Sequence, residues 1–278
     1  MKRSRISWIM FGALVVLITV LAVIPFIWTI LLSFKDNSQI VNDPMGLPAS
    51  FDFFNYRKAL DVLDIGRMYA NTIMLAAAST AAGVLITFMS SYAIARLSFR
   101  IKSLPDKLFL FLIIGLAVPV YILLFPIYRI NVKLHILGTF IGLILPYIAI
   151  NISFNTLLFV GFLREFPLEL EEAATIDGCN TAQTMFRIVA PVMKPTFVTV
   201  VLFNAIYIFN EFPFASTFLS DSRKYTLSLM TSMFRGQYSM DYGAIIAASI
   251  MMIIPELIFY AIFQRRIISG MTAGAVKE

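Results

Sequence analysis

The chain has 278 residues, of which 59% are hydrophobic and only 14% are charged. This balance is too apolar for an ordinary soluble domain and indicates an integral membrane protein. A single Cys and a single His exclude a disulfide framework and clustered Cys or His metal sites. The net charge of +6 is placed at the edges of apolar runs, which suits membrane topology better than nucleic-acid binding.

About 20 apolar residues are needed to cross the hydrocarbon core of a bilayer. The sequence predicts six such spans within one all-α membrane domain over residues 1–278. In chain order, the spans are residues 8–33, 70–95, 108–128, 139–162, 195–219 and 243–264. The first apolar run is longer than the core of a secretory signal, so we expect an uncleaved helix. Pro119 and Pro126 are expected to kink the third span.

Lys and Arg residues in the short connections predict the orientation of the spans. Three basic residues precede the first span, and four lie between the second and the third. With six spans, both of these segments lie on one side, together with residues 165–191 and the tail at residues 265–278. We therefore expect both termini and the 165–191 segment on the cytoplasmic side.

Residues 165–191 (the 165–191 segment) form a long acidic and amphipathic stretch in this apolar chain. Pro167 suits the first turn of a helix, and Gly178 is expected to end that helix in a left-handed conformation. Asn180 and Gln183 have the spacing of a capping box, which predicts a second helix. The segment is therefore predicted to be a hairpin of two helices.

The second of these helices has one apolar stripe with i, i+3, i+4, i+7 spacing, formed by Ala182, Met185, Phe186 and Val189. Pro191 and Pro195 are expected to end it before the fifth span. Interfacial helices are usually basic because the cytoplasmic leaflet is negatively charged. The acidic composition therefore favours a protein partner over a position on the membrane surface.

The same segment carries a family resemblance. Glu172-Ala173-Ala174, Gly178 after three residues, and Ile188 and Pro191 further on resemble the E-A-A signature of permease subunits of ABC importers. Ala190 replaces the Leu of that signature. The chain also resembles the carbohydrate-uptake branch, and in it the second permease of maltose-type transporters. The matching stretches are Asn71-Thr72, residues 92–96, residues 125–128, Asn210-Glu211-Phe212 and residues 270–277, with Phe209 where Trp is common.

The resemblance implies the type I ABC importer permease fold, with a coupling helix hairpin, in a bacterial or archaeal plasma membrane. It implies a second homologous permease, two copies of an ABC ATPase that bind ATP and Mg, an extracytoplasmic sugar-binding protein and membrane lipid as partners. The chain has no phosphate-binding loop, so it is expected to hold no cofactor or metal and no catalytic residue. The implied ATPase-coupling residues are Glu172, Ala173, Ala174, Asp177, Gly178, Met185, Phe186 and Pro191.

Polar residues in the fourth and fifth spans are candidates for a substrate path: Asn151, Asn155, Asn204, Tyr207, Asn210 and Glu211. Interhelical hydrogen bonding is the alternative for the amides, and Glu211 has either a structural or a gating role. The cargo stays open between an oligosaccharide, a monosaccharide and glycerol phosphate. A stand-alone secondary transporter is a remote alternative, because a midplane ion site and an internal repeat are not evident. A membrane-embedded enzyme has almost no support, because no nucleophile–base pair is recognisable.

Overall fold

The computed structural model describes residues 5–234 and 240–273, and the regular elements of this part are helices. The chain divides into two compact units, Met1–Ile65 with Leu229–Leu257, and Gly66–Ser228 with Ile258–Glu278. Four helical stretches in the described part are long and apolar enough to cross a membrane: Met10–Leu32, Ile65–Arg96, Ile141–Glu165 and Tyr242–Gln264. Two bent helix pairs raise this number to six if each pair is one span. The predicted all-helical membrane fold is confirmed, and the count of six stays a prediction.

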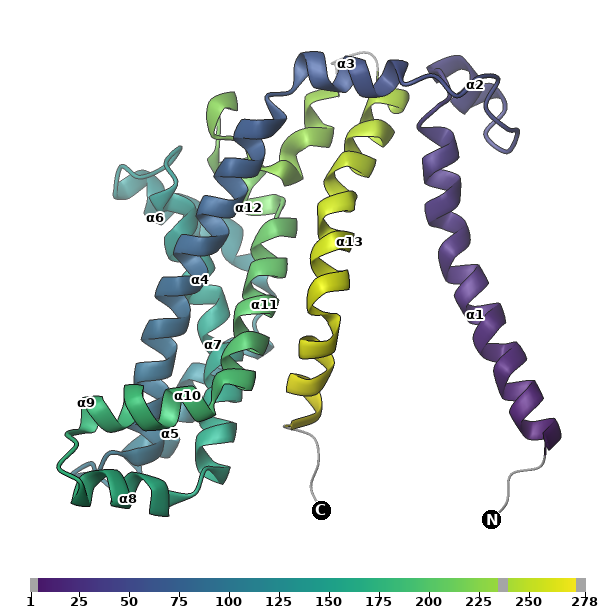
Figure 1. Cartoon of the computed structure of the whole chain (residues 1–278). Coiled ribbons are helices and arrows are strands. Elements are labelled where there is room, and N and C mark those ends of the chain that lie inside the picture. The colour runs from purple at the N-terminus through teal and green to yellow at the C-terminus, as the bar shows by residue number, and fades with distance from the viewer. Residues whose placement is uncertain (1–4, 235–239, 274–278) are drawn as a thin grey trace. The chain divides into compact units, whose positions relative to one another are not determined.

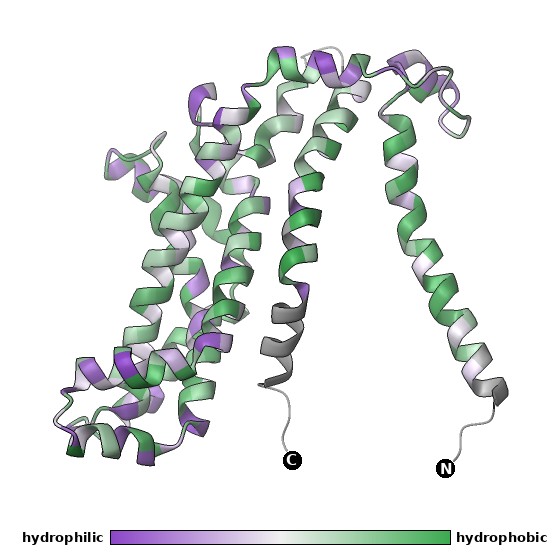
Figure 2. Ribbon diagram, in the orientation of Figure 1, coloured by the Kyte–Doolittle hydropathy of each residue, from purple (hydrophilic) through white to green (hydrophobic). Residues whose placement is uncertain are grey.

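The first unit begins with α1 (Arg5–Leu32), a helix that Figure 2 colours as mainly hydrophobic along its described length. Its 28 residues extend for about 42 Å, which exceeds the roughly 30 Å hydrocarbon core of a bilayer. The hydroxyls of Thr19 and Thr29 donate to the carbonyls of Val15 and Pro25, each at 2.8 Å, so these polar groups are satisfied within the helix. Such a helix is suited to lipid.

The connection that follows α1 is stabilised by hydrogen bonds and aromatic packing among its own residues. The Asn55 amide donates to the carbonyls of Ser33 and Lys35, both at 2.8 Å, and the buried Lys35 ammonium donates to the carbonyl of Asp43 at 2.8 Å. The Phe34 ring packs against three further aromatic rings, those of Phe51, Phe53 and Tyr56. Two short helices, α2 (Asn37–Asn42) and α3 (Phe54–Val62), lie in this connection, and α13 (Tyr242–Ala273) begins in the same unit.

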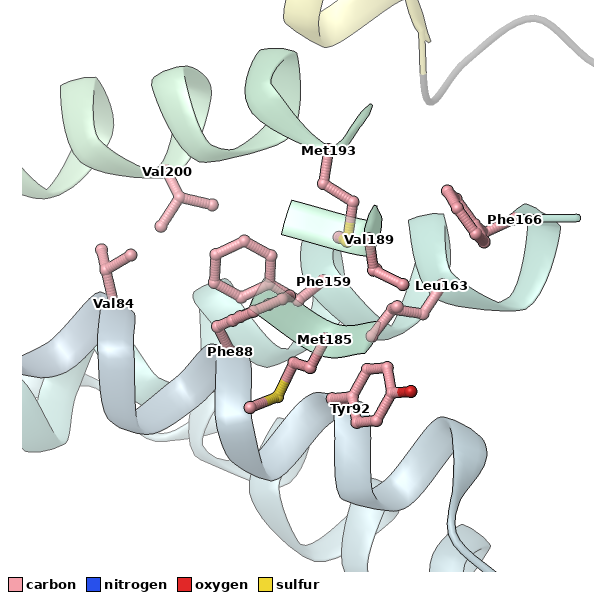
Figure 3. Packing of buried hydrophobic residues seen from close by; sticks show 10 residues of the cluster. All are labelled: Val84, Phe88, Tyr92, Phe159, Leu163, Phe166, Met185, Val189, Met193 and Val200. Carbon is pink, nitrogen blue, oxygen red and sulfur yellow. The ribbon is translucent and has the colours of Figure 1, made fainter. Parts of the chain in front are cut away.

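The second unit is built around α4 (Ile65–Arg96), α7 (Ile141–Glu165) and α11 (Lys194–Asn210). Their apolar side chains share one buried cluster, in which the Phe88 ring lies 5.6 Å from that of Phe159 and 4.7 Å from that of Phe197. Figure 3 shows Phe88 and Phe159 within this cluster, with Met185 beside Phe88 and Tyr92. Because lipid tails are as apolar as these side chains, close packing rather than the hydrophobic effect holds the helices together in a membrane.

The first turns of α4 are hydrogen-bonded to the segment that follows α12 (Pro213–Phe218). The Asn71 amide donates to the carbonyls of Arg223 at 3.0 Å and Tyr225 at 2.9 Å. The backbone N–H of Leu227 donates to the Thr72 hydroxyl at 2.9 Å. The Asn71-Thr72 pair therefore satisfies backbone polar groups of the irregular stretch from Arg223 to Leu227, which begins within the 3₁₀ turn Ser222–Lys224 and ends where the 3₁₀ turns of Leu227–Phe234 begin.

The predicted third span, residues 108–128, is not one continuous helix. It is divided between α5 (Leu104–Ile113), 3₁₀ turns at Ile114–Ala117 and Val120–Leu123, and α6 (Leu124–Lys133), and the two halves meet at 94°. The break is at Val118, whose backbone is extended as expected of a residue before proline, here Pro119. The kink predicted at Pro119 is confirmed. The kink predicted at Pro126 is wrong, because the helical stretch Val120–Lys133 runs through Pro126 without a break. Pro126 lies where the 3₁₀ turn passes into the first turn of α6.

The predicted fifth span, residues 195–219, is also interrupted. Helix α11 ends at Asn210, the backbone at Glu211 is extended, and α12 begins at Pro213. The predicted tail at residues 265–278 is helical up to Ala273 as part of α13, and its residues 274–278 lie outside the described residues.

Candidate functional site

The 165–191 segment begins with α8 (Leu168–Ile176), which ends in a glycine-dependent turn. The N–H of Cys179 donates to the carbonyl of Ala174 at 2.9 Å, and the N–H of Gly178 donates to that of Thr175 at 3.0 Å. Together these two bonds form a Schellman motif, which requires a left-handed residue after the helix. Gly178 has φ of +84°, so the predicted left-handed end is confirmed. Pro167 lies one residue before the helix, at the N-cap position, rather than in its first turn.

The second half of the segment is helical from Thr181 to Val192, and its capping box is confirmed. The Asn180 side chain accepts from the N–H of Gln183 at 2.9 Å, and the Gln183 side chain accepts from the N–H of Asn180 at 2.8 Å. After α9 (Thr181–Gln183), residues Thr184–Val189 form a π-helix that leads into α10 (Ala190–Val192). Pro191 has no N–H to donate to the carbonyl of Arg187, which favours the wider turn before it.

The π-helix changes which residues of the second helix are buried. Thr184, Met185 and Val189 are buried, whereas Ala182 is exposed and Phe186 is 44% exposed. The predicted single stripe is therefore wrong for Ala182. The partly exposed Phe186 still contacts the buried cluster, because its ring lies 6.1 Å from that of Phe88. The spacing differs because a π turn holds more residues than the 3.6 of an α-helix. Pro191 does not end the helix, and the chain bends at Met193, where the preceding helix meets α11 at 80°.

The outer face of α8 carries the signature residues. Glu172, Ala173, Asp177 and Gly178 are exposed, whereas Ala174 is buried. A Cβ added at Gly178 would meet no atom within 4 Å, so open space surrounds the turn. Of the other implied coupling residues, Phe186 and Pro191 are exposed and Met185 is part of the apolar cluster. The segment thus presents an exposed surface that combines acidic residues with apolar side chains, among them Ile176 at 86% exposed, next to a packed base.

Glu171, which sequence reasoning did not single out, joins α8 to the end of α4. Its carboxylate accepts from Arg96 Nε at 2.6 Å and from the Tyr92 hydroxyl at 2.8 Å. Arg96 Nη2 also donates to the carbonyl of Phe166 at 3.1 Å, at the end of α7 and two residues before α8 begins. Tyr92 and Arg96 are four residues apart, so the sequence is sufficient to predict that they share one helix face. It is not sufficient to predict that Glu171 is their common partner. Figure 1 shows α8, α9 and α10 at the end of this unit where α5 lies.

Glu211 lies at the break between α11 and α12, and its carboxylate has three donors. The Tyr147 hydroxyl donates at 2.6 Å, and the backbone N–H groups of Phe214 and Ala215 donate at 2.7 and 3.0 Å. The carbonyl of Glu211 accepts from the Ser228 hydroxyl at 2.6 Å. Because the carboxylate satisfies the first N–H groups of α12, its geometry is that of a helix cap.

The other candidate path residues differ in exposure. Asn155 on α7 and Asn204 on α11 are buried, and within the described part of the chain neither side chain has a hydrogen-bond partner. The Asn151 amide donates to the carbonyl of Tyr147 on its own helix at 2.9 Å. Asn210 is exposed, at the end of α11. The candidate path residues thus include two buried amides without partners and one exposed amide.

Comparison with known proteins gives these features a family. The family described as binding-protein-dependent transport system inner membrane component matches residues 83–271. A multiple sugar-binding transport system permease protein of Streptococcus mutans is 32% identical over 99% of both chains. A diacetylchitobiose uptake system permease protein of Streptomyces coelicolor is 29% identical over 95% of this chain and 87% of that protein.

A solved structure shares the fold. A chain of a bacterial ABC transporter involved in the import of the acidic polysaccharide alginate is similar with a TM-score of 0.76 and 21% identity, over 95% of this chain and 99% of that chain. The family match covers more than half of the chain, including the whole of the 165–191 segment. The chain therefore belongs to the family of inner membrane components of binding-protein-dependent transport systems.

Proposed function

We propose that this chain is a permease subunit of an ATP-driven importer that carries a carbohydrate, preferably an oligosaccharide, into the cytoplasm. The observation that carries this proposal is the exposed outer face of α8, with Glu172 and Ala173 beside the open turn at Gly178. An exposed face that joins acidic groups to an apolar side chain such as Ile176, beside a turn with open space, is suited to enter a cleft of another protein. Relatives described as sugar permeases support the carbohydrate class.

In this proposal, two ATPase subunits bind ATP and Mg on the cytoplasmic side. One of them receives the 165–191 segment, and the other receives the corresponding hairpin of the second permease. Glu172 and Asp177 make polar contacts in the ATPase cleft, and the exposed Ala173 allows the ATPase to approach closely. The buried Ala174 keeps the inner side of α8 small, and Gly178 permits the turn. Movement of the ATPase subunits then shifts the membrane helices between inward-open and outward-open states. A second homologous permease completes the substrate path, and an extracytoplasmic binding protein delivers the sugar.

The proposed substrate path comprises Asn151, Asn155, Asn204, Tyr207, Asn210 and Glu211. Sugars are bound by hydrogen bonds and aromatic surfaces, and α7 and α11 supply amides and one tyrosine for this purpose. Asn210 is the exposed amide of this set, so it is the residue that we expect to affect substrate selectivity most directly. The buried Asn155 and Asn204 fit better with hydrogen bonds that form when the helices move.

Reconstitution tests the proposed function. The chain is purified with its co-expressed partner permease and ATPase subunits and placed in liposomes, with the binding protein and labelled sugar outside. We expect uptake only when ATP and Mg are inside the liposomes and the binding protein is outside. Uptake by this chain alone, driven by an ion gradient, would instead establish the secondary-transporter alternative.

The cargo is tested by titrating the binding protein with three ligand classes, namely an oligosaccharide, a monosaccharide and glycerol phosphate. We expect the tightest binding, and ATP-dependent uptake, for the oligosaccharide. Tighter binding and uptake of glycerol phosphate or a monosaccharide would show that this compound, and not an oligosaccharide, is the cargo. The proposed importer class would be unaffected.

A further inference from the structure

Helix α8 is joined to the end of α4 by buried polar side chains. A surface that only docks a partner would not require this contact. Arg96, Tyr92 and Glu171 form one buried polar group (the Arg96–Glu171 link), which lies on the inner side of α8. We propose that this link is the positioning element that transmits movement of α8 to α4. The inference rests on the proposed function, because it assumes that a partner moves the outer face of α8.

Both carboxylate oxygens of Glu171 are used, one by Arg96 Nε at 2.6 Å and the other by the Tyr92 hydroxyl at 2.8 Å. Arg96 also donates from Nη2 to the carbonyl of Phe166 at 3.1 Å, so it contacts both the entrance of α8 and its middle. A charged group held at two points by directional bonds restricts rotation of one helix on another, which apolar contacts alone do less well. The link therefore fixes the orientation of α8 relative to the end of α4.

Glu171 and Glu172 are neighbours in sequence, but they face different surroundings. Successive helical residues are about 100° apart, and Glu171 is 8% exposed whereas Glu172 is exposed. Movement imposed on the Glu172 face thus reaches α4 through the body of α8 and the Glu171 carboxylate. Tyr92 connects the link to the packed helices as well, because its ring is part of the apolar cluster that contains Met185.

Because the Arg96–Glu171 link is buried, a suitable variant can distinguish a positioning role from a stabilising role. The side chains of Arg96 and Glu171 are both 11% exposed. Replacing a buried ion pair with apolar residues of similar volume often leaves stability unchanged or raises it, whereas removing one partner is strongly destabilising. A double replacement by Met therefore keeps the packing but removes the directional bonds. This variant distinguishes positioning from folding.

A second ion pair in the same unit supplies the matched control. Arg164 on α7 lies 3.1 Å from Asp106 on α5, with side chains that are 51% and 80% exposed. An exposed pair of this kind contributes little, because water and salt screen it. Asp106→Asn removes an Arg–carboxylate ion pair without touching the Arg96–Glu171 link.

The experiment uses the complete complex, with partner permease, ATPase subunits and binding protein, in liposomes. Three quantities are measured, namely co-purification of the ATPase, ATP hydrolysis, and sugar transported per ATP hydrolysed. For Arg96→Met with Glu171→Met, we expect co-purification and hydrolysis close to those of the wild type, and about tenfold less sugar per ATP, within the usual range of coupling between sites. The charge-reversed pair Arg96→Glu with Glu171→Arg is expected to recover part of this loss, and Asp106→Asn is expected to match the wild type.

A double-Met variant with normal sugar per ATP would overturn the inference. Loss of ATPase co-purification in that variant would also overturn it, because the link would then serve to fold the docking surface. A wild-type complex without ATP-dependent uptake is a different result, since it would refute the proposed function and the link with it. Normal co-purification with a lowered transport ratio supports a positioning role.

Discussion

Replacement of Gly178 by Val tests whether the turn between α8 and α9 determines coupling. Gly178 has φ of +84°, and a non-glycine residue in this region costs roughly 1–2 kcal/mol. A Cβ at this position meets nothing within 4 Å, so the expected cost comes from the backbone rather than from a clash. An energy of this size lowers the population of the native turn by a factor of about 5–30, yet it is small against a global stability of about 5–15 kcal/mol.

We therefore expect the Gly178→Val subunit to insert into the membrane and assemble, but to transport less substrate for each ATP hydrolysed. Asn tolerates left-handed backbone, so transport per ATP is expected to decrease in the order Gly, Asn, Ala, Val at this position. The assay is reconstituted uptake measured in parallel with phosphate release. Gly138 supplies a matched control, because it has φ of +76° and equally open space but lies in a different connection.

Gly138→Val introduces the same kind of backbone strain, and we expect it to leave transport per ATP unchanged. Normal uptake by Gly178→Val, with normal ATPase co-purification, would refute the reasoning. So would an equal loss of coupling in the Gly138 variant, since the effect would then report general strain in the subunit.

Two further predictions concern stability. Glu211→Gln is expected to lower the free energy of unfolding by about 1–3 kcal/mol, because one amide oxygen cannot accept from three donors. Tyr147→Phe, which removes one of these donors, is expected to lower it by about 1 kcal/mol. Thermal unfolding in lipid nanodiscs measures both variants, and unchanged midpoints would contradict the assignment of Glu211 as a helix cap. Burial alone would raise the pKa of Asp241, but the ammonium of Lys58 and the N–H of Ala244 outweigh it, and this pKa is below its usual value. The resulting stability is present above about pH 4 and is lost as the pH falls through the lower pKa of the folded state. Asp241→Asn should remove the decrease of the unfolding midpoint at acid pH that the Asp241 carboxylate causes. Identical pH profiles of the variant and the wild type would contradict this role of Asp241.

Local chemistry explains which features of the 165–191 segment were predictable. Gly178, Asn180 and Gln183 act through hydrogen bonds to residues no more than a few positions away, so their types and spacing were sufficient to predict the turn and the cap. Pro119 also acts locally, because a proline restricts the backbone of the residue before it, here Val118. A proline alone does not predict a break, however, since Pro25, Pro146 and Pro255 lie inside continuous helices. Apolar length likewise predicted membrane helices, since the requirement of about 20 residues is set by the bilayer.

Tertiary structure decided the features that depend on partners far along the chain. Glu171 and Glu172 are the same residue type in adjacent positions, and only the packing of α8 against α4 determines that Glu171 faces Arg96. Glu211 was identified in the sequence, but Tyr147 and Ser228, which contact it, lie 64 and 17 residues away. The sequence by itself determined the membrane fold and the local turns of the segment. Which acid contacts the neighbouring helix was decided by packing, because a distant contact leaves no fixed spacing in the sequence.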